Sequence, residues 1–319
     1  MNGVAAGGGM HLVLAADGRY AMPLAAAVAS AARRTDARRG IVFHLLHSAF
    51  PAALRRKVER SLQGAGRPLA RIEWIPLEMG RLAGLRLVHD YMSPLIYARL
   101  LIPDLLPADV GRALYLDADM VVLEDLASLW DTDLGGRSVG AVRDRIGHVG
   151  APGGLVNHAA LGIPADAPYF NSGLLLMDLA RWRALGIGRR VVEYLETHRD
   201  LIQMGDQDGL NALLHHDWHE LPFRWNWQTL PRMHRQGPPT CWSPASAHQS
   251  IVHFSSSEKP WLPGCELADR RFFFEAVDRT AWAGWRVPAW REAWVRIKRA
   301  LRGGQRRLQG ALAPGRRAA

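Results

Sequence analysis

Acidic side chains follow two apolar runs that have strand character. Asp17 comes after HLVLAA (11–16), and Asp117 and Asp119 come after ALYL (113–116), in the order D-A-D. Carboxylate oxygens are the ligands that Mg²⁺ and Mn²⁺ prefer, and a phosphate can complete the shell of such an ion. In an extended chain the two aspartates of D-x-D face opposite ways, so both reach one ion only where the chain turns. Turn formation and helix capping are the alternative explanations of the triplet.

A second polar group stands near the end of the body, in the segment HFSSSEKPW (253–261). His253 follows a short apolar run, and imidazole added to two carboxylates favours Mn²⁺ over Mg²⁺. Lys259 is one of three lysines in a chain with 37 arginines. A lysine ammonium can neutralise a phosphate as a compact charge. A packed histidine and a surface lysine are the alternative interpretations.

Strands and helices alternate along the part of the chain that carries these residues. Strands are predicted at 11–16, 41–46, 72–77, 113–116 and 171–179, and helices at 23–34, 51–63, 94–101 and 185–198. This alternation is typical of an α/β domain whose largely parallel sheet is covered on both faces. In such sheets ligands bind outside the carboxyl ends of the strands, where Asp17 and Asp117 fall. The stretch 146–167 is predicted to be a long loop.

Length and composition exclude several classes of protein. The chain has 319 residues, with 48% hydrophobic and 22% charged residues, which excludes a disordered or fibrous protein. Two cysteines cannot form a disulfide framework, so a reducing compartment is expected. The longest apolar run is shorter than a membrane span. Residues 1–9 lack the features of a signal peptide and are predicted to be a flexible leader.

The positive charge is confined to the end of the chain. Residues 279–319 contain eleven Lys and Arg and one acidic residue, which accounts for the net charge of +10. Nucleic-acid-binding folds carry their basic surface on the folded body, so no nucleic acid partner is expected. The tail is rich in Trp as well as in basic residues, and an amphipathic helix of this kind can lie in the interface of an anionic membrane. The alternatives for the tail are packing on the body and binding to a nucleic acid or an acidic partner. Four apolar residues recur here at helical spacing among basic ones: Trp290, Trp294, Ile297 and Leu301.

Seven segments, some of them already described, occur in a distinctive order along the chain. They are LAADGRY (14–20), IYARLLIP (96–103), ALYLDADMVV (113–122), LWDTDLGG (129–136), YFNSGLLLMDLARWR (169–183), GDQDGLN (205–211) and HFSSSEKPW (253–261). Together they resemble glycosyltransferase family 8, and within it the bacterial lipooligosaccharide galactosyltransferases and glucosyltransferases. The resemblance implies a retaining enzyme of the GT-A fold over residues 10–278, Rossmann-like with a mostly parallel central sheet flanked by helices. Residues 279–319 form the basic aromatic tail.

The resemblance also implies the substrates and the place of action. A hexose, galactose or glucose, would pass from a UDP-sugar to a saccharide or glycolipid acceptor, with lipopolysaccharide core as the expected one. The acceptor pocket would be built from loops such as 146–167 and 225–241. With the basic tail, this suggests a cytoplasmic protein that is peripheral on the inner membrane.

Each residue of the donor site receives a role from the resemblance. Asp117, Asp119 and His253 would bind Mn²⁺, with Mg²⁺ as the alternative ion. Asp17 would accept from the uracil edge, Tyr20 would stack on its ring, and Lys259 would lie against the diphosphate. The remaining implied donor contacts are Ala15, Ala118 and Ser256.

Five polar side chains would hold the transferred sugar: Arg99, Asp144, Asn171, Asp206 and Gln207. Their ordinary alternatives are an ion pair for Arg99, a turn for Asn171 and a helix N-cap for Asp206. Retention requires a covalent intermediate or attack from the face of the leaving group. Gln207 matches the amide that the family places below the anomeric carbon, and an amide is a poor nucleophile. Front-face attack is therefore the favoured hypothesis, with Asp206 or Asp144 as the alternative nucleophile.

The chain departs from the family pattern at two places. Ser256 replaces the glycine of H-x-x-G-x-x-K-P-W, which adds bulk and restricts φ in that loop. Gly18 and Arg19 replace an acidic and an amide residue of the nucleotide turn. Neither change removes an implied metal ligand or Lys259, so an active enzyme is expected. A nucleotidyltransferase and a catalytically silent membrane- or polyanion-binding protein are the alternative functions.

Overall fold

The computed structural model describes residues 9–36, 38–82, 84–88, 93–229, 248–295, 297–299 and 301. Three predicted features lie wholly or partly outside these residues. They are residues 1–8 of the leader, 230–241 of the second acceptor loop and the tail beyond 301.

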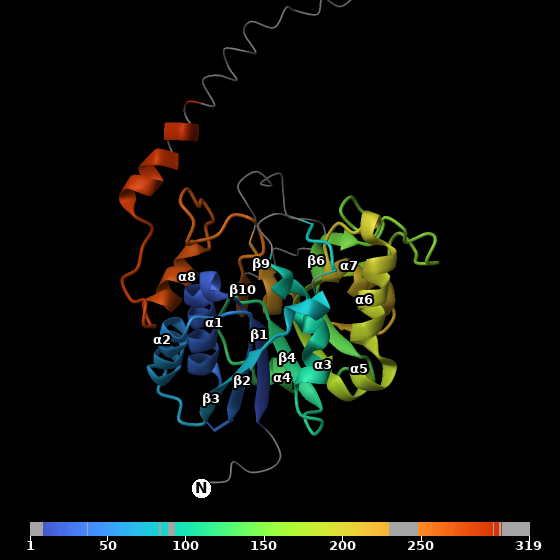
Figure 1. The fold of residues 1–319 in the computed structure, drawn as a ribbon, viewed down its shortest axis with the longest axis horizontal. Helices are drawn as coiled ribbons and strands as arrows, with labels where there is room; N and C mark the ends of the chain where they lie inside the picture. Colours follow the sequence, from blue (N-terminus) through green and yellow to red (C-terminus); the bar gives the residue numbers. More distant parts are fainter. Residues whose placement is uncertain are drawn as a thin grey trace, which may run out of the picture.

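A seven-stranded sheet forms the centre of the molecule, in the order β3-β2-β1-β4-β7-β6-β8 (Figure 1). Its first half is parallel and contains β3 (Ala70–Pro76), β2 (Ile41–His47), β1 (Met10–Ala15) and β4 (Arg112–Leu116). β7 (Pro168–Asp178) pairs antiparallel with β4 and β6 (Val139–His148), and β8 (Trp218–Glu220) is parallel to β6. The predicted α/β class with a mostly parallel sheet is confirmed.

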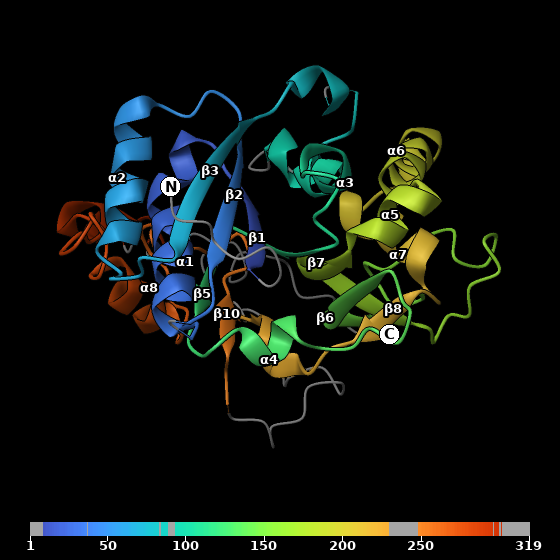
Figure 2. The same ribbon diagram turned by 90° about the horizontal axis from the view of Figure 1, so that it is seen from below.

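Helices cover both faces of the sheet (Figures 1 and 2). One face carries α1 (Ala21–Arg34) and α2 (Ala52–Gln63), and α8 (Arg270–Val277) packs against α1 on the same side of the molecule. The alanine-rich α1 is buried along most of its length, because its small side chains allow it to approach the sheet closely. The other face carries the 3₁₀ helix η3 (Pro94–Leu101) with α3 (Ile102–Leu105), α5 (Leu179–Leu185), α6 (Ile187–Thr197) and α7 (Asp206–Leu214).

Several predicted boundaries differ from the structure. The helix predicted at 94–101 is a 3₁₀ helix rather than an α-helix. The helix predicted at 185–198 starts at Ile187, because Gly186, with φ of 58°, separates it from α5. β6 continues to His148, so the loop predicted from 146 starts three residues later, and it contains turns up to the start of β7.

A second, three-stranded sheet brings distant segments of the chain together. β10 (Ile251–His253) lies between β5 (Met120–Val122), to which it is antiparallel, and β9 (Trp227–Gln228), to which it is parallel. In this register His253 pairs with Met120. The D-A-D turn ends one residue before Met120, so the pairing places the histidine beside both aspartates.

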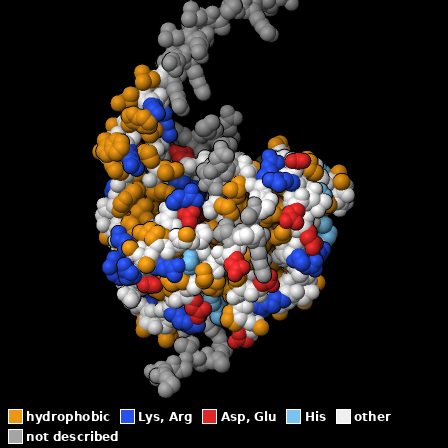
Figure 3. Space-filling model, in the orientation of Figure 1, with side chains coloured by type: hydrophobic (Ala, Val, Ile, Leu, Met, Phe, Trp, Pro, Cys, Tyr) orange, Lys and Arg blue, Asp and Glu red, His pale blue; other side chains and the backbone are white. Residues whose placement is uncertain are grey.

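The basic tail has two parts with different environments. Trp282 and Trp285 are partly buried against the core, and Lys57 lies 4.6 Å above the Trp282 ring. From 289 onward the described tail residues are helical. Packing against the body therefore continues past residue 278, whereas four large apolar side chains of the helix are exposed (Figure 3). Their exposed fractions are 68% for Trp290, 54% for Trp294, 58% for Ile297 and 64% for Leu301.

Candidate active site

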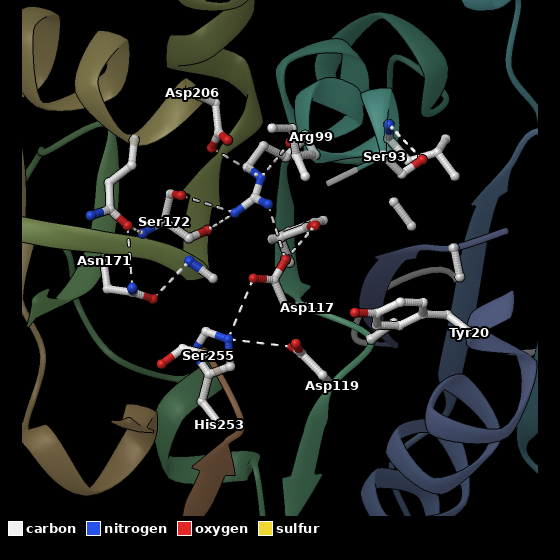
Figure 4. A pocket seen from close by; sticks show the side chains of 18 of the residues that line it. Tyr20, Ser93, Arg99, Asp117, Asp119, Asn171, Ser172, Asp206, His253 and Ser255 are labelled. Atoms are coloured by element: carbon white, nitrogen blue, oxygen red, sulfur yellow. Dashed lines mark hydrogen bonds and ion pairs between the residues drawn. The ribbon is translucent and has the colours of Figure 1, made fainter. Parts of the chain in front are cut away.

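A cavity of about 200 Å³ opens at the carboxyl ends of β1 and β4, beside β7, α7 and the segment after β10 (Figure 4). Most of the predicted site residues line it: Ala15, Asp17, Tyr20, Arg99, Asp117, Ala118, Asp119, Asn171, Asp206, Gln207, His253 and Lys259. The structure thus brings together side chains from six separate parts of the sequence. Of the predicted site residues, Asp144 and Ser256 lie outside this lining.

Two carboxylates and one imidazole converge at the floor of the cavity. The chain turns after β4, with Met120 N–H donating to the Asp117 carbonyl at 3.2 Å, so both aspartates of D-A-D face the same space. His253 Nε2 lies 3.6 Å from Asp117 Oδ2 and 3.3 Å from Asp119 Oδ1. One ligand atom from each of these residues lies within 4.8 Å of the others.

This cluster fits a divalent cation. Asp119 Oδ1 is buried and has no hydrogen-bond partner among the described residues, a costly state that a cation would relieve. Lys259 Nζ donates to Asp119 Oδ2 and to the Phe254 carbonyl, both at 2.6 Å. Burial favours the neutral form of Asp119, but the ammonium of Lys259 opposes burial, and the pKa of Asp119 lies below its usual value. Asp119 is therefore an ionised ligand, and carboxylates with imidazole suit Mn²⁺.

A buried guanidinium connects the cluster of Asp117, Asp119 and His253, called the metal cluster below, to the opposite wall of the cavity. Arg99 donates to Asp117 Oδ1 at 3.0 Å and to the Ser172 carbonyl, and its Nε lies 3.2 Å from Asp206 Oδ2. Burial raises the pKa of Asp206 to about 6, although Arg99 opposes the shift. The N-cap of α7 is Gly205, with Asp206 as the first helical residue, so Asp206 does not have the alternative capping role.

Tyr115 is a site residue that the sequence analysis missed. Its hydroxyl donates to Asp117 Oδ1 at 2.8 Å, and the Arg99 guanidinium lies 4.5 Å from its ring centre. Tyr115 stands two residues before Asp117, so strand alternation places both on one face and would have indicated the contact.

An amide network lies on the side of the cavity that carries the residues predicted to hold the sugar, called the sugar side below. Asn171 Nδ2 donates to Asp144 Oδ2 at 2.8 Å and to Gln207 Oε1 at 3.2 Å. Gln207 Nε2 donates to Asp144 Oδ2 at 3.3 Å. Asp144 thus holds two amides that line the cavity while it lies behind them.

β7 approaches the metal cluster very closely at Gly173. Its carbonyl accepts from Asp117 N–H at 2.8 Å. A Cβ at this position would lie 2.8 Å from Asp117 Oδ2 and closer still to His253 Cε1. Only glycine leaves room here for the carboxylate and the imidazole side by side.

The opposite side of the cavity carries Asp17 and Tyr20, which are predicted to contact the nucleotide, and is called the nucleotide side below. It is formed by the short 3₁₀ helix η1 (Gly18–Tyr20). Asp17 caps this helix by accepting from Arg19 N–H at 2.8 Å, and it also accepts from the Arg19 side chain. Tyr20 packs edge to face on Trp261, with 5.5 Å between ring centres. The tyrosine lies across the cavity from the sugar side (Figure 4).

Ser256 forms a local turn beside the cavity. Its hydroxyl donates to the Glu258 carbonyl at 3.1 Å. Among the described non-glycine residues only Ala49 has a positive φ, so the serine is accommodated without left-handed strain. The preceding residue, Ser255, does line the cavity, and its buried hydroxyl has no partner within the described part of the chain. The sequence analysis missed Ser255, because neighbouring serines look alike in sequence.

An α/β sheet with this polar, cation-fitting cluster at its carboxyl edge defines an enzyme of the GT-A fold. Residues 11–264 match the profile of glycosyl transferase family 8, and the chain belongs to this family. Galactosyltransferase LgtC, solved in complex with donor and acceptor sugar analogs, superposes with a TM-score of 0.71 at 29% identity; the match covers 85% of this chain and 96% of LgtC. Of the three functions considered, glycosyl transfer is the one that this membership supports.

Two curated relatives have similar levels of identity. General stress protein A of Bacillus subtilis (strain 168) is 29% identical over 281 residues, which are 86% of this chain and 94% of that protein. Glycosyltransferase GlyF of Streptococcus pneumoniae serotype 4 (strain ATCC BAA-334 / TIGR4) is 28% identical over 260 residues, covering 78% of this chain and 56% of GlyF. Within the described residues, no helix has the length and apolar character that crossing a bilayer requires.

Proposed function

We propose that this glycosyltransferase is a retaining, metal-dependent enzyme that transfers a hexose from a UDP-sugar to a saccharide acceptor. The observation that carries the proposal is the convergence of Asp117, Asp119 and His253 with Lys259 beside the polar pocket of Arg99. The hexose is galactose or glucose, and the proposed acceptor is lipopolysaccharide or lipooligosaccharide core. The galactosyltransferase title of LgtC supports galactose as the first donor to test.

The site's charges suit the departure of UDP. Breaking the sugar–phosphate bond develops negative charge on the diphosphate and positive charge on the anomeric carbon. A divalent cation held by the two aspartates and His253 would supply Lewis acidity at the diphosphate. Lys259, held by Asp119 and a backbone carbonyl, adds a positive charge at a fixed place.

Front-face attack agrees with the environment of the candidate nucleophiles. Gln207 Oε1 already accepts from Ser172 N–H and Asn171, so it orients groups rather than attacking carbon. Asp144 lies behind these amides. Asp206 lines the cavity, but its Oδ2 faces Arg99. In the proposed mechanism the departing phosphate oxygen takes the proton of the acceptor hydroxyl. A glycosyl adduct on Asp206 or Asp144, detected by mass spectrometry, would contradict this mechanism.

Donor hydrolysis tests the proposed function without knowledge of the acceptor. UDP release from UDP-galactose and UDP-glucose is measured with Mn²⁺ or with EDTA. We expect slow release from one donor that EDTA abolishes and that Asp119→Ala lowers by at least about a hundredfold, since the ion's charge stabilisation is lost. Asp109→Ala, an exposed aspartate outside the cavity lining, is the matched control and should keep wild-type rates. Metal-independent release would overturn the proposal.

The tail supports peripheral binding to an anionic membrane, proposed here as the cytoplasmic face of the inner membrane. The tail helix contacts the body through Val295, which lies against Gly264, and through polar groups: Glu292 accepts from Gly264 N–H at 2.8 Å, and Arg299 donates to Glu266 at 2.8 Å. Its Trp, Ile and Leu side chains are exposed, and hydrophobic atoms cover this part of the surface (Figure 3). Indoles and basic groups arranged in this way suit the headgroup region.

Sedimentation with vesicles of anionic phosphatidylglycerol tests this part. Truncation after Val287 keeps the packed Trp282 and Trp285, and it should abolish sedimentation at physiological salt while donor hydrolysis persists. Trp290→Ser with Trp294→Ser keeps the charge of the tail and should also weaken binding. Equal sedimentation of the truncated protein would contradict interfacial binding.

A further inference from the structure

A buried asparagine joins the metal cluster to the sugar side of the cavity. Asn226 ends the 3₁₀ helix η5 (Phe223–Asn226), and its side chain is fully buried. Its Oδ1 lies 2.9 Å from His253 Nδ1, and its Nδ2 donates to Asn171 Oδ1 at 2.8 Å. Asn226 does not line the cavity and no sequence motif singles it out.

The backbone of β7 determines which atom of each amide donates. Gly173 N–H can only donate, and at 3.0 Å it faces Asn171, so the facing atom is the carbonyl oxygen Oδ1. Ser172 N–H likewise identifies Gln207 Oε1 as an oxygen at 3.0 Å. The Asn171 nitrogen then faces Gln207 and Asp144, which agrees with both contacts.

The same logic continues to the histidine. Because Asn171 Oδ1 is an acceptor, the Asn226 atom that faces it is the nitrogen, and the oxygen of Asn226 faces His253. A carbonyl oxygen cannot donate, so His253 Nδ1 carries the proton. In the neutral ring the lone pair of His253 is therefore on Nε2, the atom that points toward Asp117 and Asp119. Two backbone N–H groups thus determine the tautomer of a proposed metal ligand three side chains away.

We propose that Asn226 is a positioning residue that holds His253 in its metal-binding tautomer and ties the metal cluster to the sugar-binding amides. The proposal rests on the metal-dependent function proposed above. Groups that orient a ligating histidine contribute substantially to metal affinity, and their loss typically costs 10–100-fold. Through its hydrogen bond to Asn171, the Asn226 amide also fixes the position of His253 relative to the residues that would hold the donor sugar.

Two substitutions separate positioning from simple packing. Asn226→Ala removes both contacts. Asn226→Asp keeps an oxygen for His253 Nδ1–H, but it loses the donor to Asn171 and buries a charge. We expect Mn²⁺ affinity, measured by electron paramagnetic resonance of free Mn²⁺ at saturating UDP, to fall roughly 10–100-fold in Asn226→Ala and to stay within a few-fold in Asn226→Asp.

The two variants should rank in the opposite order for stability. Asn226→Asp buries a carboxylate charge, so it should lower the thermal midpoint of the metal-free protein at least as much as Asn226→Ala does. If packing alone mattered, Mn²⁺ affinity would fall with stability in both variants, and that result would overturn the inference. Asn211→Ala is the control: Asn211 is equally buried, and it bonds the backbone of Phe170 and Gln207. It should lose stability and keep wild-type Mn²⁺ affinity.

Ring ¹⁵N shifts of the wild-type protein test the tautomer without any metal or folding-sensitive variant. We expect His253, assigned by comparison with His253→Gln, to carry its proton on Nδ1. A proton on Nε2 in the neutral ring would overturn the inference. Wild-type protein that binds UDP but no Mn²⁺ would contradict the proposed metal-dependent function. Normal Mn²⁺ binding with both Asn226 variants unchanged would instead overturn this inference alone.

Discussion

The two sides of the cavity differ in how far their polar side chains are buried and held by other protein groups. On the sugar side, formed by η3, β7 and α7, the polar side chains are no more than 7% exposed, and protein groups contact each of them: Arg99, Asn171, Asp206 and Gln207. On the nucleotide side, formed by the end of β1 and by η1, Asp17 and Tyr20 are partly exposed. The side chain of Arg19, which pairs with Asp17, is 70% exposed.

This difference separates stability from affinity. The sugar side is arranged during folding, so its polar groups are desolvated before any ligand arrives and depend on one another. The nucleotide side keeps much of its hydration and can adjust when a base binds. Substitutions on the sugar side should therefore change folding and function together, whereas those on the nucleotide side should change binding alone.

The largest effect is expected at Arg99. Arg99→Met removes the positive charge between Asp117 and Asp206 and leaves a buried carboxylate without a counter-charge. The free energy of unfolding should fall by about 3–5 kcal/mol, as measured by urea denaturation. Arg99→Lys retains the charge but loses the forked geometry, so a smaller loss is expected. A loss below about 1 kcal/mol for Arg99→Met would show that the sugar side is not interdependent.

Asp206 should make stability depend on pH. Its pKa is about 6 in the folded protein against an ordinary 3.8, so the folded state holds the proton more tightly. Its contribution to stability is present below pH 4 and is lost as the pH rises through 6, with a total of roughly 2–3 kcal/mol. Asp206→Asn should lack this loss, so its advantage in urea midpoint over wild type should be larger at pH 7.5 than at pH 4.5. An equal difference at both pH values would contradict the assignment, and donor hydrolysis should fall in the variant.

Tyr20 tests the nucleotide side. Tyr20→Ala should raise the Kd for UDP roughly tenfold, because stacking on a base contributes about 1–3 kcal/mol. Tyr20→Phe keeps the ring and should retain wild-type affinity in the same calorimetric titration. If Tyr20→Phe bound as weakly as Tyr20→Ala, the hydroxyl and not the ring would be the contact.

The smallest effect is expected at Arg19. Its ion pair with Asp17 is exposed, so Arg19→Ala should change the free energy of unfolding by no more than about 0.5 kcal/mol. The substitution frees Asp17 from its side-chain partner, and UDP should bind at least as tightly as in wild type. Much weaker UDP binding would mean that Arg19 itself contacts the ligand, which would revise the picture of this side.

The sequence predicted the strands and most of the residues that line the cavity, but not the contacts that hold those residues in place. The strands that precede Asp17 and Asp117 are continuous apolar runs, which are typical of strands buried on both faces of a parallel sheet. The resemblance to family 8 supplied residues such as Arg99 and Gln207, which the structure places in the same cavity. Asn226 and Ser255 could not be predicted, because their positions depend on the pairing of β10 with β5 and β9. The pairing of β10 with β5 joins segments about 130 residues apart, and the pairing with β9 joins segments 25 residues apart.

The close approach of β7 at Gly173 has a consequence for anyone who redesigns donor choice in this protein. No side chain fits there without displacing the strand or His253, so a mutant library should leave this position unchanged. Ser93 and Met204 line the same cavity from loops and are partly exposed. Diversity introduced at these two positions can reshape the pocket while the cation-binding wall keeps its dimensions.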